Sequence, residues 1–265
     1  MIKEKVSLYT LKGEQRSYRK YEESKRSSLF GSDQKLKFIL IYLKEHPNQE
    51  FMASYSQMLQ SKVSEWIQFI LPILVESLQK LKVIPKTGNE FTIPDHLDYI
   101  LCDVTEREVN RSIDHEVQKE LYSGKQKTHT VKKIILSDHN QYVYFLGETY
   151  EGSMHDKEIW NQLTLKKSPI NILANLGFLG ADKQHENIVL PFKNSKKKEI
   201  TDLQKQINKG ISSLRIKVEH TFASIKRLKI MKQKINLKRN EIRHQVMVIA
   251  TTLHNLRVQF RHLSN

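Results

Sequence analysis

The sequence has little cysteine, no long apolar run and, over its last quarter, few acidic residues. Cys102 is the only cysteine among the 265 residues, which excludes an internal disulfide and a metal site built from several thiolates. We expect Cys102 to be a small buried side chain in a strand. The longest apolar run, Phe69 to Val75, has seven residues and contains Pro72, whereas a membrane span needs roughly 18. The N-terminus carries no apolar stretch of secretory-signal length, so a cytoplasmic protein is expected.

Positive charge is concentrated near the C-terminus. The formal net charge is +15, and residues 191–265 hold 18 Lys and Arg against 4 Asp and Glu, which leaves +1 for residues 1–190. Lys and Arg that displace counterions from phosphates supply most of the sequence-independent affinity for nucleic acid. The distribution therefore indicates a surface that binds phosphates. A basic helix face that is merely solvated is the alternative.

Residues 32–84 are predicted to form a small all-α domain of three short helices. Apolar residues have the i, i+3, i+4, i+7 spacing of an amphipathic helix at Leu36, Ile39, Leu40 and Leu43. We expect Ser32 or Asp33 to cap this helix and a second helix to cover about residues 50–58. Ser61 is expected to cap the third helix, which Pro72 should kink. Residues 1–31 are polar and are expected to form a tail or a loosely docked helix.

Three short helices whose last two are joined by a tight turn are typical of a helix-turn-helix. The recognition helix would begin near Ser61. Its exposed side chains, which would face DNA, are Gln60, Ser61, Lys62, Ser64, Glu65 and Gln68. The alternative is a helical bundle that serves only for packing or dimerisation.

After a loop over residues 85–94, short β-type runs alternate with helical segments. Strands are expected over residues 99–104, 133–137, 142–149, 169–174 and 188–192. Helices are expected over residues 155–163, 200–207, 211–229 and 239–260. This order predicts an α/β domain with a mixed sheet over residues 95–265.

Three polar residues of this domain lie at positions typical of catalytic or ligand-binding sites. Asp103 lies in the middle of an apolar strand, where a carboxylate must be paired, hydrated or bound to a metal. Asn175 ends a strand, at the edge where open α/β sheets bind ligands. Glu219 shares a helix face with Arg215 and Lys226. The structural alternatives are a salt bridge for Asp103, a turn for Asn175 and a solvated helix face for Glu219.

Four stretches, in this order and spacing, carry a family resemblance. They are Gln60-Ser-Lys-Val-Ser-Glu-Trp-Ile, Tyr122-Ser-Gly-Lys-Gln-Lys-Thr-His-Thr-Val-Lys, Gly152-Ser-Met-His-Asp-Lys, and Leu173-Ala-Asn-Leu-Gly-Phe-Leu-Gly followed by Arg215-Ile-Lys-Val-Glu-His-Thr-Phe. Over about residues 35–260 the sequence resembles the DDE transposases of bacterial insertion sequences, in the branch allied to the eukaryotic Harbinger elements. The resemblance implies a ribonuclease-H-like catalytic domain, a mixed sheet with flanking helices, preceded by the helix-turn-helix domain.

The resemblance assigns the catalytic, metal-binding positions to Asp103, Asn175 and Glu219. The chain departs from the family pattern at Asn175, which replaces the second aspartate, and at Ser212, which replaces a tyrosine. In the family, the carboxylates hold two Mg²⁺ or Mn²⁺ ions roughly 3.5–4 Å apart, which activate the attacking oxygen and stabilise the leaving oxygen. Because Asn175 brings no negative charge, we expect weak metal binding and little strand cleavage. If position 175 is not a ligand, Asp156 or Asp182 would take its place.

The resemblance also implies double-stranded DNA as partner, namely the element's terminal inverted repeats and target DNA, a homodimer on that DNA, and association with the nucleoid. Arg215 and Lys226 would position phosphates or terminal bases. A DNA-facing hairpin would contribute Lys125, Lys127, His129, Lys132 and Lys133. His155 and Asp156 would cap a helix or, alternatively, support the ligands of the site. The alternative functions are a catalytically dead, DNA-binding relative of transposases and a host nuclease of the same fold.

Overall fold

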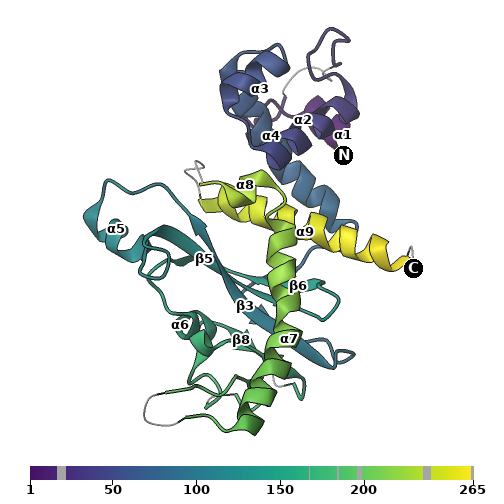
Figure 1. Cartoon of the computed structure of the whole chain (residues 1–265). Coiled ribbons are helices and arrows are strands. Elements are labelled where there is room, and N and C mark those ends of the chain that lie inside the picture. Colours follow the sequence, from purple (N-terminus) through teal and green to yellow (C-terminus); the bar gives the residue numbers. More distant parts are fainter. Residues whose placement is uncertain (17–21, 167, 184, 196–198, 235–239, 264–265) are drawn as a thin grey trace. The chain divides into compact units, whose positions relative to one another are not determined.

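The chain divides into two compact units, which we describe separately (Figure 1). The computed structural model describes residues 1–16, 22–166, 168–183, 185–195, 199–234 and 240–263. Unit 1 comprises Met1–Ile84 and Lys226–Ala250, and unit 2 comprises Pro85–Ile225 and Thr251–Asn265. Within the described ranges, no helix is both long enough and apolar enough to cross a membrane.

Unit 1 consists of helices. Their bounds are Ile2–Leu8 for α1, Gly31–Glu45 for α2, Gln49–Tyr55 for α3, Gln60–Gln79 for α4, Lys229–Lys232 for α8 and Asn240–Leu263 for α9, whose later part belongs to unit 2. Helix α4 packs on α3 and on α2. The apolar spacing predicted for these helices is realised in the core, where Ile39, Leu43 and Val63 are fully buried. The three helices expected over residues 32–84 are therefore present, and the turn between α3 and α4 gives the helix-turn-helix arrangement.

The helix starts differ from those predicted. Helix α2 begins at Gly31 after Phe30 rather than after Ser32 or Asp33, because the Glu23 carboxylate, from upstream in the chain, accepts the Gly31 N–H at 3.0 Å. Helix α4 begins at Gln60 after Leu59, so Ser61 lies inside the first turn instead of capping it. Free N–H groups at an exposed helix start can be satisfied by water.

Unit 2 is built on a mixed sheet. Its strands are β1 (Lys86–Gly88), β3 (Tyr99–Glu108), β4 (Tyr122–Ser123), β5 (Thr128–Ser137), β6 (Val143–Gly147), β7 (Tyr150–Glu151), β9 (Asn171–Leu173) and β10 (Ile188–Val189). The order is β1-β6-β5-β3-β9-β10, with β4 and β7 paired to β5, while β2 (Glu90–Phe91) and β8 (Thr164–Leu165) form a separate pair. Strand β3 runs antiparallel to β5 and parallel to β9. This sheet with its flanking helices is a ribonuclease-H-like α/β fold, as predicted.

The helices of unit 2 are α5 (His115–Leu121), α6 (Asp156–Asn161), the short η1 (Leu176–Phe178), α7 (Asp202–Ile225) and the end of α9. The two helices expected over residues 200–207 and 211–229 are one helix, α7, up to Ile225. Gly210 does not interrupt it, because a glycine costs a helix only about 1 kcal/mol. Strands β3 and β5 are longer than predicted, since charged residues of the two strands face each other, as in the pair Glu106 and Lys132.

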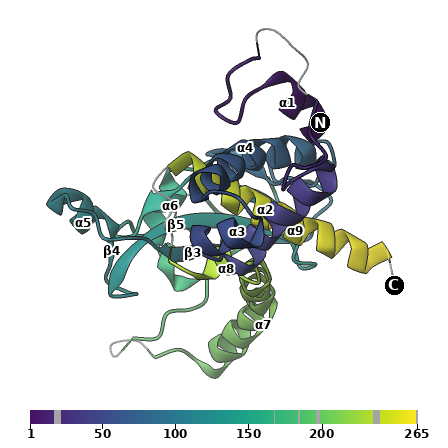
Figure 2. The ribbon, with the colours of Figure 1, turned by 90° about the horizontal axis from the view of Figure 1, so that it is seen from above.

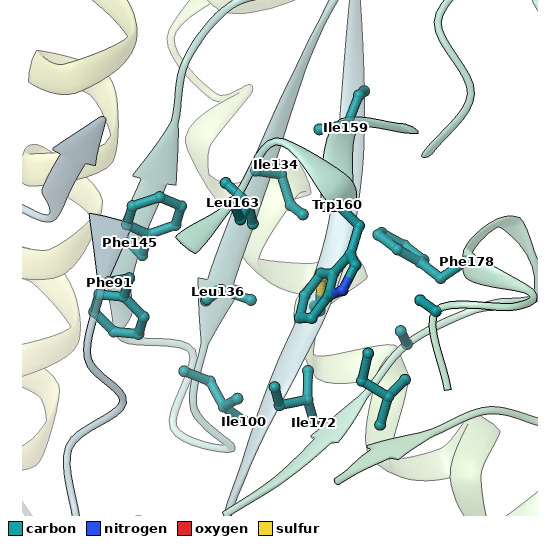
Figure 3. Packing of buried hydrophobic residues seen from close by; sticks show 14 of the residues in the cluster. Phe91, Ile100, Ile134, Leu136, Phe145, Ile159, Trp160, Leu163, Ile172 and Phe178 are labelled. Carbon is teal, nitrogen blue, oxygen red and sulfur yellow. The ribbon is translucent and has the colours of Figure 1, made fainter. Parts of the chain in front are cut away.

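The two faces of β3 have different partners. On one face Ile100 and Cys102 join a large buried cluster around Trp160 of α6, in which Phe178 stands edge-on to the indole ring (Figure 3). The expectation that Cys102 is buried in a strand is thus confirmed. On the other face Leu101 packs with Leu173 of β9 and Val218 of α7. Because side chains alternate along a strand, Asp103 lies on the same face as Leu101, towards α7.

Candidate active site

Asp103 and Asn175 are neighbours because their strands run parallel. Leu101 of β3 pairs in register with Leu173 of β9, so residues two positions further along the chain come to the same edge of the sheet. There the Asn175 amide nitrogen Nδ2 donates a hydrogen bond of 2.9 Å to Asp103 Oδ1. The sequence predicted that these two residues belong to one site, and the structure brings them into direct contact.

The Asp103 carboxylate is largely buried and lies beside a cation. Its side chain is 14% exposed, and its Oδ2 lies 3.5 Å from Nη2 of Arg215 on α7. Its Oδ1 also accepts the Val104 N–H at 2.9 Å. Burial raises the pKa of Asp103 above its ordinary value, although the Arg215 guanidinium acts in the opposite direction. The Asp103 carboxylate is thus stabilised by specific partners, while its burial makes ionisation less favourable.

The orientation of the Asn175 amide follows from its two partners. Its Oδ1 accepts the Gly177 N–H at 2.6 Å, while Nδ2 faces Asp103. The opposite orientation would place the amide NH₂ against an N–H donor and the amide oxygen against a carboxylate oxygen, which is unfavourable at both ends. Asn175 therefore turns an N–H donor, not an oxygen, towards Asp103.

Helix α7 supplies the remaining residues predicted for the site. Val218 is buried against the sheet, and Arg215, about one turn earlier, reaches Asp103. The Arg215 Nε is buried without a hydrogen-bond partner. Glu219 is exposed, and the contacts found among the described residues include none between it and Asp103 or Asn175. The structure therefore brings together Asp103, Asn175 and Arg215 but leaves Glu219 in solvent.

A buried ion-pair network lies next to these residues. Lys132 on β5 is 9% exposed, and its Nζ lies 3.4 Å from Asp156 Oδ1 and 3.8 Å from Glu106 Oε1. It also donates a hydrogen bond of 2.8 Å to the Met154 carbonyl oxygen. The negative charge of Asp156 contributes to raising the pKa of Asp103, so this network acts electrostatically on the site. Lys132, predicted to contact DNA, lies inside the protein here.

The Gly152-Ser-Met-His-Asp-Lys motif joins this network to the site. His155 is the N-cap of α6, which agrees with the capping role considered for it, and its N–H donates to Glu158 Oε2 at 3.0 Å. Asp156 follows, and its Oδ2 lies against Gly177, where an added Cβ would approach to 2.5 Å. Glu106 was not identified from the sequence as part of the site. Its position opposite Lys132 in the paired strands β3 and β5 is the feature that indicates its role in the ion-pair network.

The other residues predicted to bind DNA occupy three places. Gln60, Ser61, Lys62 and Gln68 are exposed on the first turns of α4, and Ser64 is half-buried. In unit 2, Lys125 and Lys127 are exposed in the turn between β4 and β5, and His129 is half-buried at the start of β5. Lys133 is buried and donates to the Gly147 carbonyl oxygen at 2.9 Å. Lys226 belongs to unit 1 and is half-buried.

Divalent cations do not fit the arrangement of Asp103 and Asn175. The amide turns its donor towards the carboxylate, its oxygen is used by Gly177, and Arg215 already supplies a positive charge. Asp182, the other alternative ligand, is exposed and accepts the Gly180 N–H at 2.9 Å. Over the described part of the chain, no three His, Cys, Asp or Glu side chains form a group that could hold a metal ion.

Comparisons with known proteins place these residues in a family. The family described as DDE superfamily endonuclease matches residues 102–255, which include Asp103, Asn175, Arg215 and Glu219. A probable transposase for insertion sequence element IS702 from Microchaete diplosiphon is 28% identical over 227 residues, which cover 85% of this chain and 79% of that protein. No solved structure matches the chain. The matched residues span more than half of the chain, which therefore belongs to the DDE superfamily of endonucleases, the group of insertion-sequence transposases that its motifs resemble.

Proposed function

We propose that this chain is a transposase that binds the terminal inverted repeats of its element and target DNA, and that Asn175 impairs its strand cleavage and strand transfer. The observation that carries the proposal is the hydrogen bond from Asn175 Nδ2 to Asp103 Oδ1. In the family pattern the two positions joined by this hydrogen bond are both carboxylates. A catalytically dead, DNA-binding relative is the alternative, and the experiment below separates the two.

The electrostatics of the pair explain why the amide matters. Two carboxylates at this distance repel each other, so an aspartate at position 175 would require a shared cation or proton between the two side chains. The amide removes that requirement by donating a hydrogen bond instead. DDE superfamily endonucleases generally use divalent metal ions, which, held by carboxylates, would supply Lewis-acid stabilisation of the reacting oxygens. We infer that Asn175 stabilises the site without metal and thereby lowers its affinity for Mg²⁺ or Mn²⁺.

DNA binding is assigned to two surfaces, one in each unit. The exposed first turns of α4 offer Gln60, Lys62 and Gln68 to base edges, as expected of a recognition helix. In unit 2 the Lys125 and Lys127 side chains are exposed in the β4–β5 turn, Lys125 acts electrostatically on Asp103, and Arg215 lies beside Asp103. In this assignment residues 32–84 recognise the DNA sequence and unit 2 carries the catalytic fold, while the basic C-terminal segment is divided between the two units.

A transposase joins two element ends, so the active species is proposed to be a homodimer on DNA at the nucleoid. The basic residues near the C-terminus would then supply phosphate contacts shared by all sequences, with Lys226 among them. In this proposal the phosphate contacts bind the ends of the element without regard to sequence, while α4 recognises the sequence of the terminal repeats.

The test compares the parent chain with Asn175→Asp. A labelled duplex that carries the element's terminal repeat is incubated with each protein and Mg²⁺ or Mn²⁺, and nicking is followed over time. Asn161→Asp, at an exposed position at the end of α6, is the matched control because it makes the same chemical change outside the site. A second readout is the rise in unfolding temperature on adding Mn²⁺, which measures metal binding without catalysis.

Asn175→Asp is expected to gain both nicking and a Mn²⁺-dependent rise in unfolding temperature, whereas the parent and Asn161→Asp should show neither. Equal nicking by the parent and Asn175→Asp would contradict the proposed role of position 175. If both proteins bind the repeat and neither cuts it, the chain is a DNA-binding relative without catalysis.

A further inference from the structure

A shallow pocket of about 540 Å³ opens beside the β4–β5 hairpin of unit 2. It is lined by Arg111, His115, Gln118, Lys119, Tyr122 and His129. These residues come from the segment after β3, from α5, from β4 and from the start of β5. Helix α5 lies away from α7, which carries Arg215, in both views, and Figure 2 shows β4 on the same side as α5 (Figures 1 and 2). The lining of the pocket does not include Asp103, Asn175 or Arg215, although Lys125 in the adjoining turn acts electrostatically on Asp103.

One wall of the pocket is aromatic. Tyr122 and His129 are paired across the hairpin, and their rings meet edge to face with centroids 5.8 Å apart. Tyr122 is 46% exposed, so much of its ring remains open to a ligand. Proteins that bind single-stranded nucleic acid use exposed aromatic rings as stacking platforms, because every base has a flat π-face.

Cationic side chains also line the pocket, and hydrogen bonds hold one of them, Arg111, in place. The Arg111 Nε donates to Gln118 Oε1 at 2.8 Å, and Gln118 Nε2 donates to the Ser112 carbonyl oxygen at 2.8 Å. No carboxylate belongs to the lining that the described residues form. Lys119 has an ion pair with Glu116, but both side chains are more than 70% exposed, so a phosphate could replace that weak contact.

The charges beside the pocket add to its cationic lining. Lys125 and Lys127 are exposed in the turn that joins β4 to β5, a few residues from Tyr122. A nucleotide strand that placed one base against Tyr122 would carry its neighbouring phosphates past these lysines. The volume is within the range of roughly 300–1,000 Å³ usual for small-molecule binding sites.

We propose that this pocket binds one unpaired nucleotide of a DNA strand, with the base on the Tyr122 ring and the phosphate at Arg111 and Lys119. The base must be unpaired, because bases within a duplex keep their faces stacked on one another. This inference rests on the proposed function to the extent that the chain binds DNA. The inference adds that the protein binds strand ends or distorted junctions more tightly than intact duplex.

The test measures binding of the full chain to three probes by fluorescence anisotropy at low salt. They are a blunt duplex, the same duplex with a short single-stranded thymine overhang, and free thymidine monophosphate as competitor. The variants are Tyr122→Ala, Tyr122→Phe and, as control, Phe192→Ala, whose ring is 42% exposed outside the pocket. We expect the parent to prefer the overhang by about five- to tenfold, in the range of one stacked base.

Tyr122→Ala should lose this preference while its affinity for blunt duplex stays unchanged, and Tyr122→Phe and Phe192→Ala should keep it. Equal binding of the two duplexes by the parent would overturn the pocket assignment but leave DNA binding intact. Failure to bind either duplex would overturn the proposed function as well. Strong competition by free thymidine monophosphate would identify a free-nucleotide site and also overturn the proposal.

Discussion

At the scale of single residues, the pair Asp103 and Asn175 shows how one amide changes a buried site. Burial raises the pKa of Asp103, and the Arg215 guanidinium, the Val104 N–H and the Lys125 charge act in the opposite direction. Asn175 adds a hydrogen bond from its Nδ2 to the carboxylate. The partner that the family pattern would supply, a second carboxylate, would instead add to the cost. In our proposal such a site needs no metal for its stability, and it lacks the negative charge that would attract one.

Lys133 gives a pH-dependent prediction about stability. Burial lowers the pKa of this lysine from 10.5 to about 8, and its Nζ donates to the Gly147 carbonyl oxygen. Below pH 8 Lys133 is therefore protonated in the folded protein, and burial of its ammonium group lowers the free energy of unfolding. Between pH 8 and 10.5 the unfolded state binds more protons than the folded state, so this group makes the fold more stable as the pH rises.

The measurement is the difference in unfolding free energy between the parent and Lys133→Met. From pH 7 to pH 10.5 this difference should move in favour of the parent by about 3 kcal/mol, the equivalent of the pKa change. Lys209→Met, at an exposed position on α7, should show almost no such change. A difference that stays constant over this range would mean that Lys133 titrates normally.

The sequence predicted some residues well and others poorly, for physical reasons. The family resemblance implied that Asp103 and Asn175 share a site, and the structure explains it, because the parallel strands β3 and β9 align the two positions at one edge. Lys132 could not be placed. Its hairpin motif suggested a surface residue, and its burial depends on Asp156, which comes from another element 24 residues away.

At the scale of elements, Gly152 shows why the motif around it begins with glycine. An added Cβ would lie 2.4 Å from the Leu121 carbonyl oxygen and 2.7 Å from the Thr130 carbonyl oxygen. Both are backbone atoms, which cannot rotate away. The close approach brings the turn after β7 against β5 and so fixes the start of α6, where Asp156 meets Lys132.

Gly152→Ala is therefore expected to destabilise the protein by about 2 kcal/mol or more, the cost of an overpacked contact that cannot relax. The matched control is Gly124→Ala in the β4–β5 turn, where no heavy atom lies within 4 Å of the added Cβ. Thermal unfolding followed by circular dichroism compares the two. Equal unfolding temperatures for both variants would show that the chain near Gly152 moves to accommodate a side chain.

Helix and strand types were predictable from periodicity, whereas their ends were less so. The apolar stripe placed α4 correctly, but its first residue and the start of α2 follow contacts that no local pattern carries, such as the one from Glu23 to Gly31. Strand β5 extends back to Thr128 because β3 and β4 both pair with it there. Where a helix or strand begins and ends depends on the groups that its terminal residues contact, and those contacts depend on the tertiary structure.

At the scale of the whole molecule, unit 1 is built from two segments of the chain that lie far apart in the sequence, Met1–Ile84 and Lys226–Ala250. The sequence predicted one domain over residues 95–265, and the segment Lys226–Ala250 makes its contacts with the N-terminal helices instead. Ile230 and Met231 of α8 are buried, and α8 packs on α2. No local pattern carries this information, because the contacts join residues more than 180 positions apart.

Polar contacts support the same packing. Lys44 donates to the Arg227 carbonyl oxygen at 3.0 Å, and the His46 ring nitrogen Nδ1 lies 2.7 Å from Gln233 Oε1. Lys229 forms an ion pair with Glu45. The end of α2 is thus held by α8 and by the residues around it. A fragment that stops at Ile84 leaves this end of α2 without its partners.

We therefore expect that residues 1–84, expressed alone, unfold at a lower temperature and less cooperatively than unit 1 does in the full chain. A synthetic peptide of residues 226–250 should raise the unfolding temperature of the fragment in a concentration-dependent way, because a partner that binds only the folded state stabilises it by mass action. A scrambled peptide of the same composition, which keeps the positive charge but not the order of apolar residues, should have no such effect. If residues 1–84 unfold cooperatively and neither peptide changes their unfolding temperature, the helix-turn-helix folds without its C-terminal partner, and the packing of α8 on α2 contributes little to its stability.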